Sequence, residues 1–237
     1  MTQEPLLLPL VIIALVGLTL LLAALASRYH QQQMMRRAVV QRMQMAIQRL
    51  DEGLSRLGRV PVPYEIRQLL RRDVVARYRM IGELARRSSG IAALVADAER
   101  RLAAETEQPS AVVPLADDEN QLQQWLNGLH DLVDFLNYPG LIQPLPAGAA
   151  LAYQQRLGDC GADLAARFFI HRYRERLDEL APGRAEAELE RLTSYLRTRA
   201  PDTAHVRALR QAVLELPDGG ADPSSIRVEA DDGRRAS

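Results

Sequence analysis

The sequence predicts an all-α fold in which a single N-terminal transmembrane helix precedes a soluble multi-helix bundle. One observation is an uncharged, almost wholly aliphatic stretch from Leu6 to Ala26. Another is that apolar residues recur every three or four positions through most of the remaining chain, which is the period of helices with one buried face. Clusters of proline, glycine and serine separate these periodic segments and mark the turns between helices.

The apolar stretch has the length of a membrane span. A helix over 6–26 is about 31 Å long, enough to cross a hydrocarbon core some 30 Å thick. Residues 1–5 would then form a short extracytoplasmic N-terminus. The small residues Ala24 and Ala26 before Ser27 also resemble a signal-peptide cleavage site, so cleavage and export remain the alternative.

The flanks of this stretch favour an uncleaved anchor and give it a direction. A signal peptide begins with basic residues and has an apolar core of about 7 to 15 residues, whereas this chain begins Thr2-Gln3-Glu4 and its core is longer. Positive flanks stay in the cytoplasm. We therefore expect the inner membrane of a bacterial cell, with the N-terminus outside and the C-terminal domain cytoplasmic. The basic residues that set this orientation are Arg28, Arg36, Arg37 and Arg42.

A basic juxtamembrane helical region is predicted over 27–105. Its first helix continues the span and carries an apolar seam at heptad spacing, suited to a coiled coil or to packing against neighbouring helices. The run is shorter than the three to four heptads of a firm coiled coil, which favours packing within the chain, and self-association along the seam is a hypothesis. The seam comprises Val40, Met43, Ile47, Leu50, Leu54 and Leu57.

Two further helices complete this region. The prolines in 58–63 end the first helix, and a second is predicted from Pro63 to about Arg87. Ser88-Ser89-Gly90 marks a turn before a third helix from Ile91 to about Glu105.

A linker over 106–116 separates this region from an acidic helical domain over 117–216. Asp117 or Asp118 is placed to cap a helix that ends at Asn137. A long helix should follow over 149–180, and then a helix pair over 184–199 and 204–216 with Asp202 or Thr203 as cap. The tail, 217–237, has the composition of a disordered segment.

Charge and composition narrow the function. All thirty basic residues are arginine, so chemistries that require lysine, such as a Walker-A phosphate loop or a Schiff base, are excluded. Residues 27–101 hold sixteen arginines against seven acids, whereas 102–237 hold fourteen against twenty-two. The basic part could meet anionic lipid headgroups and the acidic part a basic partner, or basic residues simply fix the topology.

Candidate chemistry is sparse. His130, Asp131 and Asp134 have the spacing of metal ligands, so a metal-dependent hydrolase is a minor alternative, but a solvated polar face explains them as well. Cys160 lies between Gly158 and Gly161, which predicts a close helix crossing rather than a catalytic thiol. The aromatic and basic residues of 168–176 are expected to form a buried aromatic cluster with a charged exterior rather than a nucleic-acid site.

The order of elements in 28–87 resembles the signalling linker called HAMP: an amphipathic helix after a span, a proline-bearing connector and a second amphipathic helix. The connector over 58–63 is short, and no kinase, cyclase or methylation helix follows it. This resemblance implies signal relay as an alternative. The main prediction is a non-enzymatic, membrane-anchored module that binds or scaffolds proteins at the cytoplasmic face, with no cofactor, metal, nucleic acid or small-molecule substrate indicated.

Overall fold

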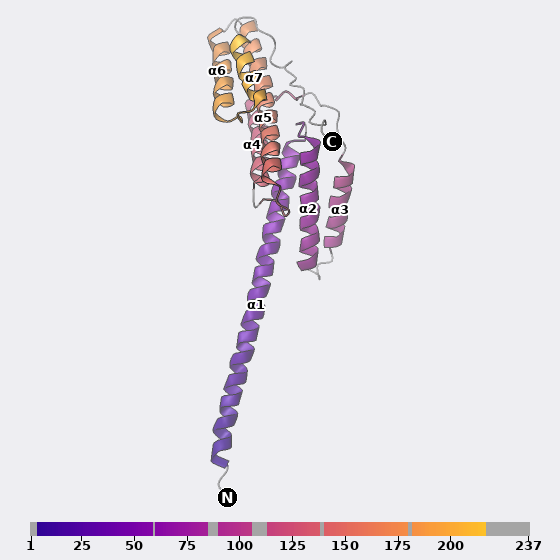
Figure 1. Cartoon of the computed structure of the whole chain (residues 1–237), viewed down its shortest axis with the longest axis vertical. Helices are drawn as coiled ribbons and strands as arrows, with labels where there is room; N and C mark the ends of the chain where they lie inside the picture. The colour runs from indigo at the N-terminus through magenta and orange to yellow at the C-terminus, as the bar shows by residue number, and fades with distance from the viewer. Residues whose placement is uncertain are drawn as a thin grey trace.

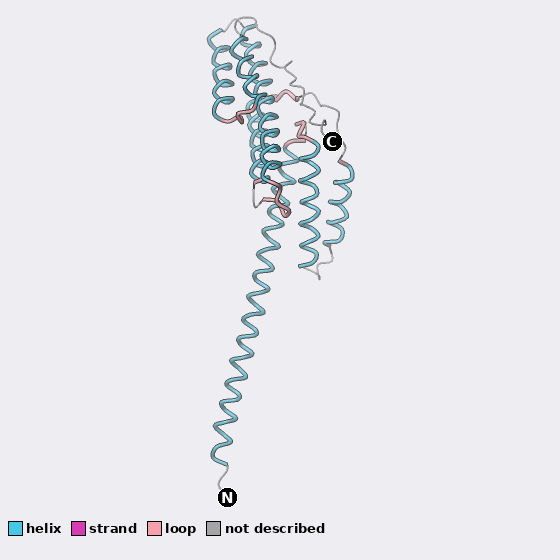
Figure 2. Tube along the Cα trace, viewed as in Figure 1, coloured by secondary structure: helices cyan, strands magenta, loops and turns pink. Residues whose placement is uncertain are grey.

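The computed structural model describes residues 4–58, 60–84, 90–105, 113–137, 140–179 and 182–216, with the side chains of 4–14, 16, 24 and 147 left out. Over these ranges the chain forms seven α-helices and no strand (Figure 2), which confirms the all-α prediction. The helices are α1 (Glu4–Arg56), α2 (Tyr64–Leu84), α3 (Ile91–Ala104), α4 (Glu119–Leu136), α5 (Ala147–Asp178), α6 (Pro182–Thr198) and α7 (Ala204–Glu215).

Helix α1 is a single rod that extends far beyond the rest of the molecule (Figure 1). It has 53 residues, which corresponds to about 80 Å. The hairpin of α2 and α3 lies beside its C-terminal part, and α4 to α7 gather at its C-terminal end. The predicted continuity between the apolar stretch and the following helix is confirmed, because no break occurs between Glu4 and Arg56.

Within the residues whose side chains the structure describes, no helix is long and apolar enough to cross a membrane.

The predicted span over 6–26 is helical throughout, as part of α1. The side chains of 6–14, 16 and 24 lie outside the described residues, and membrane spanning itself stays a prediction.

Helix α2 folds back antiparallel to α1 because the connector after Leu57 is short. Arg71 Nη1 donates to Asp51 Oδ1 at 2.8 Å, so the second turn of α2 lies opposite the last turns of α1. Helix α4 crosses the same part of α1 at close range. A Cβ atom on Gly128 would lie 3.1 Å from Leu57 Cγ, which shows how little space separates the two helices.

Helices α4 to α7 form a bundle with capped ends. Asp118 accepts a hydrogen bond from the Gln121 amide, and Thr203 accepts one from the Val206 amide. The sequence predicts both caps as alternatives, and each satisfies an amide that the first turn of a helix leaves unpaired. Helices α5 to α7 begin and end within about two residues of the predicted bounds.

The close helix crossing predicted around Cys160 is confirmed at Gly161, where an added Cβ atom would lie 3.2 Å from Tyr195 Oη on α6. A Cβ atom on Gly158 would lie 2.5 Å from Pro201 Cγ in the loop before α7, so only glycine fits at this position. The predicted aromatic cluster is also confirmed: Phe168, Phe169 and Tyr173 are buried, and the two phenylalanine rings pack edge to face at 5.3 Å.

The predicted halves of the chain share one core. Buried residues of α1 and α2 belong to the same cluster as those of α4 to α7. Across the halves, Arg156 on α5 also pairs with Glu65 on α2 at 2.9 Å. The domain boundaries stay predictions. Residues 106–112 of the predicted linker (106–116) and the whole predicted tail over 217–237 lie outside the described residues.

Candidate interaction surface

The seam on α1 divides into two parts. Ile47, Leu50, Leu54 and Leu57 are buried within the chain's own core, with Leu50 only 1% exposed. Val40 and Met43 are half-buried and pack against the edge of that core. A second copy of the chain would therefore have to contact α1 mainly on the N-terminal side of Ile47. Self-association along the seam stays a hypothesis.

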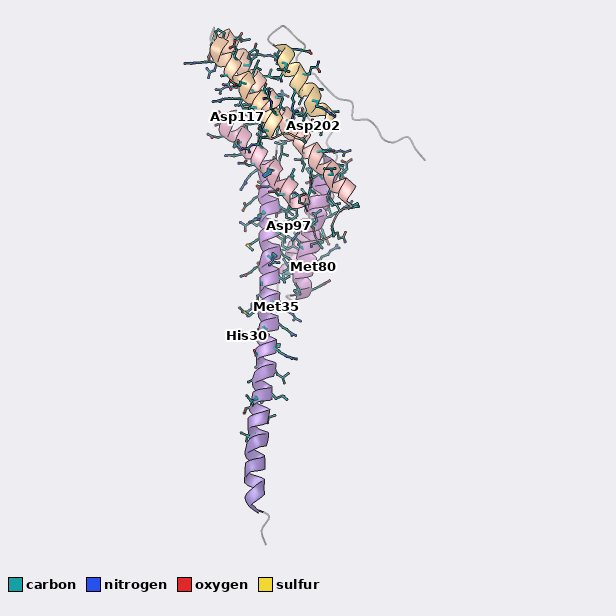
Figure 3. The ribbon with its side chains drawn as sticks, turned by 60° about the vertical axis from the view of Figure 1, so that its left-hand side comes forward. His30, Met35, Met80, Asp97, Asp117 and Asp202 are labelled. Atoms are coloured by element: carbon teal, nitrogen blue, oxygen red, sulfur yellow. The ribbon has the colours of Figure 1, made fainter. Side chains whose placement is uncertain are left out.

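The predicted membrane-proximal arginines lie at different distances from the predicted span. At 1.5 Å per residue, Arg28 lies about 3 Å beyond Ala26 along the helix axis, Arg36 and Arg37 about 15 Å, and Arg42 about 24 Å. All four are exposed. His30 and Met35, which lie between Arg28 and Arg36 in the sequence, are on the part of α1 that extends from the bundle (Figure 3). Only Arg28 is close enough to the span to lie among headgroups in an upright helix.

A groove of about 810 Å³ lies between α1 and α4, and we call it the α1–α4 groove. Helix α1 contributes Arg42, Met45 and Arg49, and Phe135 on α4 lies on the other wall. The complete lining is Arg42, Met45, Ala46, Arg49, Leu50, Glu52, Arg56, Arg77, Asp131, Leu132, Asp134, Phe135, Asn137 and Gly140.

The arginines of the α1–α4 groove differ in their partners. Arg56 pairs with Asp131 on α4 at 3.5 Å and with Glu52 at 3.5 Å. Arg77 is buried beside Asp73, and its guanidinium lies 5.2 Å from the centre of the Phe135 ring. Neither Arg42 nor Arg49 has an ion pair within the described residues. The groove therefore presents two uncompensated cations beside apolar side chains.

A buried ion pair holds one wall of this groove. Arg77 Nε donates to Asp73 Oδ2 at 2.6 Å, and both side chains are at most 9% exposed. The pair also fixes the loop after α4, because Asp73 Oδ1 accepts from the Ile142 amide at 2.7 Å and Arg77 Nη2 donates to the Gly140 carbonyl at 2.5 Å. The Asp73 carboxylate and the Arg77 guanidinium together thereby join α2 to the loop after α4.

Sequence reasoning missed this pair, although a signal was present. Asp73 and Arg77 are one helical turn apart on α2, and Asp73 directly precedes the core residues Val74 and Val75. Charges placed so close to an apolar face indicate a pair that is buried together rather than a solvated one.

The residues considered for catalysis do not assemble into a site. His130 and Asp134 are exposed and 3.7 Å apart, and Asp131 is occupied by Arg56. Over the part of the chain that the structure describes, no three His, Cys, Asp or Glu side chains are placed to hold a metal ion. Burial raises the pKa of the Cys160 thiol to about 12, with Asp163 and Asp159 adding to the effect, which leaves it protonated at neutral pH.

A second polar cluster joins α5 to α7. His205 Nε2 lies 2.6 Å from Asp163 Oδ1, and Thr203 Oγ1 donates to Asp159 Oδ1 at 2.5 Å. The hydrogen bond to Asp163 raises the pKa of His205, against the opposing effect of burial. Burial raises the pKa of Asp159. The cluster therefore couples the position of α7 to protonation.

We expect the stability of this region to decrease as the pH rises. The folded chain holds the proton of His205 more tightly than the unfolded chain does. The contribution of the His205–Asp163 pair to the free energy of unfolding is therefore complete below the ordinary histidine pKa of about 6.5. It is lost as the pH rises through the raised pKa. Urea unfolding at a series of pH values should show this decrease in the wild type and a flatter profile in His205→Gln. His171→Gln, at an exposed histidine paired with Glu175, is the matched control and should keep the wild-type profile. An identical profile in His205→Gln would contradict the assignment.

Comparisons with known proteins give no relative: no protein-family model matches the chain, and no curated protein and no solved structure is significantly similar to it. The resemblance to HAMP therefore rests on the order of elements alone, and signal relay stays a prediction.

Proposed function

We propose that this chain is a single-pass, membrane-anchored helical protein that binds or scaffolds other proteins at the cytoplasmic face of the inner membrane. The observation that carries the proposal is the N-terminal part of α1, which extends from the bundle as an isolated rod (Figure 1) and has an apolar sequence over 6–26. Such a surface needs an apolar environment to cover it.

The exposed leucines of α1 support lipid as that environment. Leu15, Leu18, Leu20, Leu21, Leu22 and Leu25 are 56–66% exposed. At about 100° per residue, Leu20 lies nearly opposite both Leu18 and Leu22, so the apolar surface surrounds the helix rather than forming one stripe. A helix that is apolar all round is one that lipid or a large core buries. The arginines that follow support a cytoplasmic position for the bundle.

The shape of the bundle supports a binding role. Its helices pack on one another, and an open groove, the α1–α4 groove, lies between two of them. Grooves of this form receive helical segments of partner proteins. The proposal is therefore a tethered binding module with no catalytic residue assigned.

Two arginines within the apolar rod should release the chain from membranes. Each costs about 2.5–3.5 kcal/mol at the centre of a span, so Leu15→Arg with Leu18→Arg opposes insertion strongly. We expect the full-length wild type to remain in the pellet after alkaline carbonate extraction and the double variant to be lost from it.

The matched control is Met34→Arg with Met35→Arg, which adds the same charge to α1 outside the predicted span, at exposed positions. This control variant should stay with the membrane.

Recovery of the wild type in the soluble fraction would refute the anchor. Activity of a C-terminal reporter that works only outside the cytoplasm would refute the orientation, and crosslinking in intact cells that captures no protein would refute the binding role.

A further inference from the structure

The cations of the α1–α4 groove form a regular row on one face of α1. Arg42, Arg49 and Arg56 follow one another at intervals of seven residues, which places them nearly in line along the helix. Arg56 at one end is engaged by Glu52 and Asp131, whereas Arg42 and Arg49 have no ion pair within the described residues. The row thus leaves two arginines, seven residues apart, without a neutralising partner within the described residues.

Apolar surface accompanies this row. Met45 is 58% exposed between Arg42 and Arg49, and Phe135 is half-buried on the facing wall. Methionine adapts its flexible, polarisable side chain to varied apolar partners and is common at binding surfaces. The α4 wall also carries Asp134, which pairs with His130 at 3.7 Å. A helical ligand that fits this groove therefore places acidic side chains on the α1 side, beside Arg42 and Arg49, and apolar side chains beside Met45 and Phe135.

The position of the groove distinguishes a protein ligand from a lipid headgroup. Along α1, Arg42 lies about 24 Å and Arg49 about 35 Å beyond Ala26. The headgroup region on each side of a bilayer is only about 5–8 Å thick, and salt screens charges beyond about 8 Å. An α1 helix perpendicular to the membrane therefore holds both arginines beyond the headgroups, where a segment of a soluble partner protein can reach them.

We propose that the α1–α4 groove binds an acidic amphipathic helix of a partner protein. The acidic side chains of that helix pair with Arg42 and Arg49, and its apolar face covers Met45 and Phe135. This inference rests on the proposed function, since the distances from the bilayer assume that 6–26 is the anchor.

The test measures binding of a defined probe to the full-length chain in detergent micelles. The probe is a fluorescein-labelled synthetic peptide in which leucine recurs every three or four residues and glutamate fills the remaining positions, followed by anisotropy. A peptide of the same composition in scrambled order, without an apolar face, is the probe control. We expect the patterned peptide to bind and the scrambled one to bind at least tenfold more weakly.

Charge reversal on the groove should remove this binding. Arg42→Glu with Arg49→Glu places two like charges against the peptide, and we expect affinity to decrease about tenfold or more. Arg36→Glu with Arg37→Glu is the matched control, because it makes the same charge change on the same helix at least a third of a turn away from Arg42 and Arg49. This control should bind the peptide as the wild type does. All four positions are exposed, and unchanged thermal melting would show that the folds are equal.

Three results would overturn the inference. One is equal peptide binding by the wild type and the Arg42→Glu, Arg49→Glu variant. Another is no peptide binding, together with binding to phosphatidylserine vesicles that only this variant loses, which would identify lipid as the ligand. The third is peptide binding only after removal of 217–237, which would make the chain's own tail the occupant. Carbonate extraction tests the anchor separately, so a failed groove leaves the proposed function standing.

Discussion

Asp73→Ala is expected to lower the free energy of unfolding by about 3–5 kcal/mol, because it removes one partner of a buried ion pair and leaves the other charged. Arg77 would remain almost fully buried without its carboxylate, and the Ile142 amide would lose its acceptor. Loss of a buried hydrogen bond adds to the cost of the uncompensated charge. The loop after α4 should lose its attachment to α2 at the same time.

Urea unfolding of the full-length chain in detergent measures this effect. Trp125 is the only tryptophan and lies buried in α4, so its fluorescence reports on the bundle beside the loop. Asp97→Ala is the matched control, since Asp97 also pairs with arginines on its own helix but at the surface. Exposed pairs contribute less than about 1 kcal/mol. Equal effects of the two substitutions would show that burial of the Asp73 pair has no energetic consequence.

Leu50→Ala should have a comparably large effect for a different reason. Leu50 is 1% exposed at the point where α1 enters the core, and removal of a leucine from such a site costs about 2–5 kcal/mol through lost burial and the cavity left behind. We expect the urea midpoint to decrease with the same tryptophan signal, because α1 and α4 pack directly on each other.

Val40→Ala on the same seam is the control for Leu50→Ala. Val40 is half-buried at the edge of the core, so its truncation should cost clearly less. Chemical crosslinking of the full-length variants separates the two uses of the seam. A Leu50→Ala chain with unchanged stability but fewer crosslinked dimers would show that this residue serves self-association instead of the core.

The positions of the helices could be predicted because they depend on local signals in the sequence. Apolar period, caps and prolines lie within a few residues of one another, and the structure places Asp118 and Thr203 at the helix starts that these signals indicate. The close approach at Gly158 could be predicted for the same reason, since absence of a side chain is visible in the sequence.

Pairing between elements could not be predicted in the same way. The spacing of Leu50 and Leu54 shows that one face of α1 is covered, but both a second copy and α4 would satisfy that pattern. The α1–α4 groove depends on this pairing, because Arg49 and Phe135 are 86 positions apart in the chain and meet only when α4 packs on α1. The Asp73 pair likewise acquires its role from a distant loop.

The length of the continuous helix α1 would set the distance between the bilayer and the bundle. Between Ala26 and Leu50 it rises about 36 Å without a break, so an anchored chain would hold its bundle at a set height above the bilayer. A partner whose recognition segment lies at that distance from the bilayer could contact the α1–α4 groove. A partner whose segment lies closer to the bilayer could not. Helix length, and not only surface chemistry, would thereby select what the protein can reach.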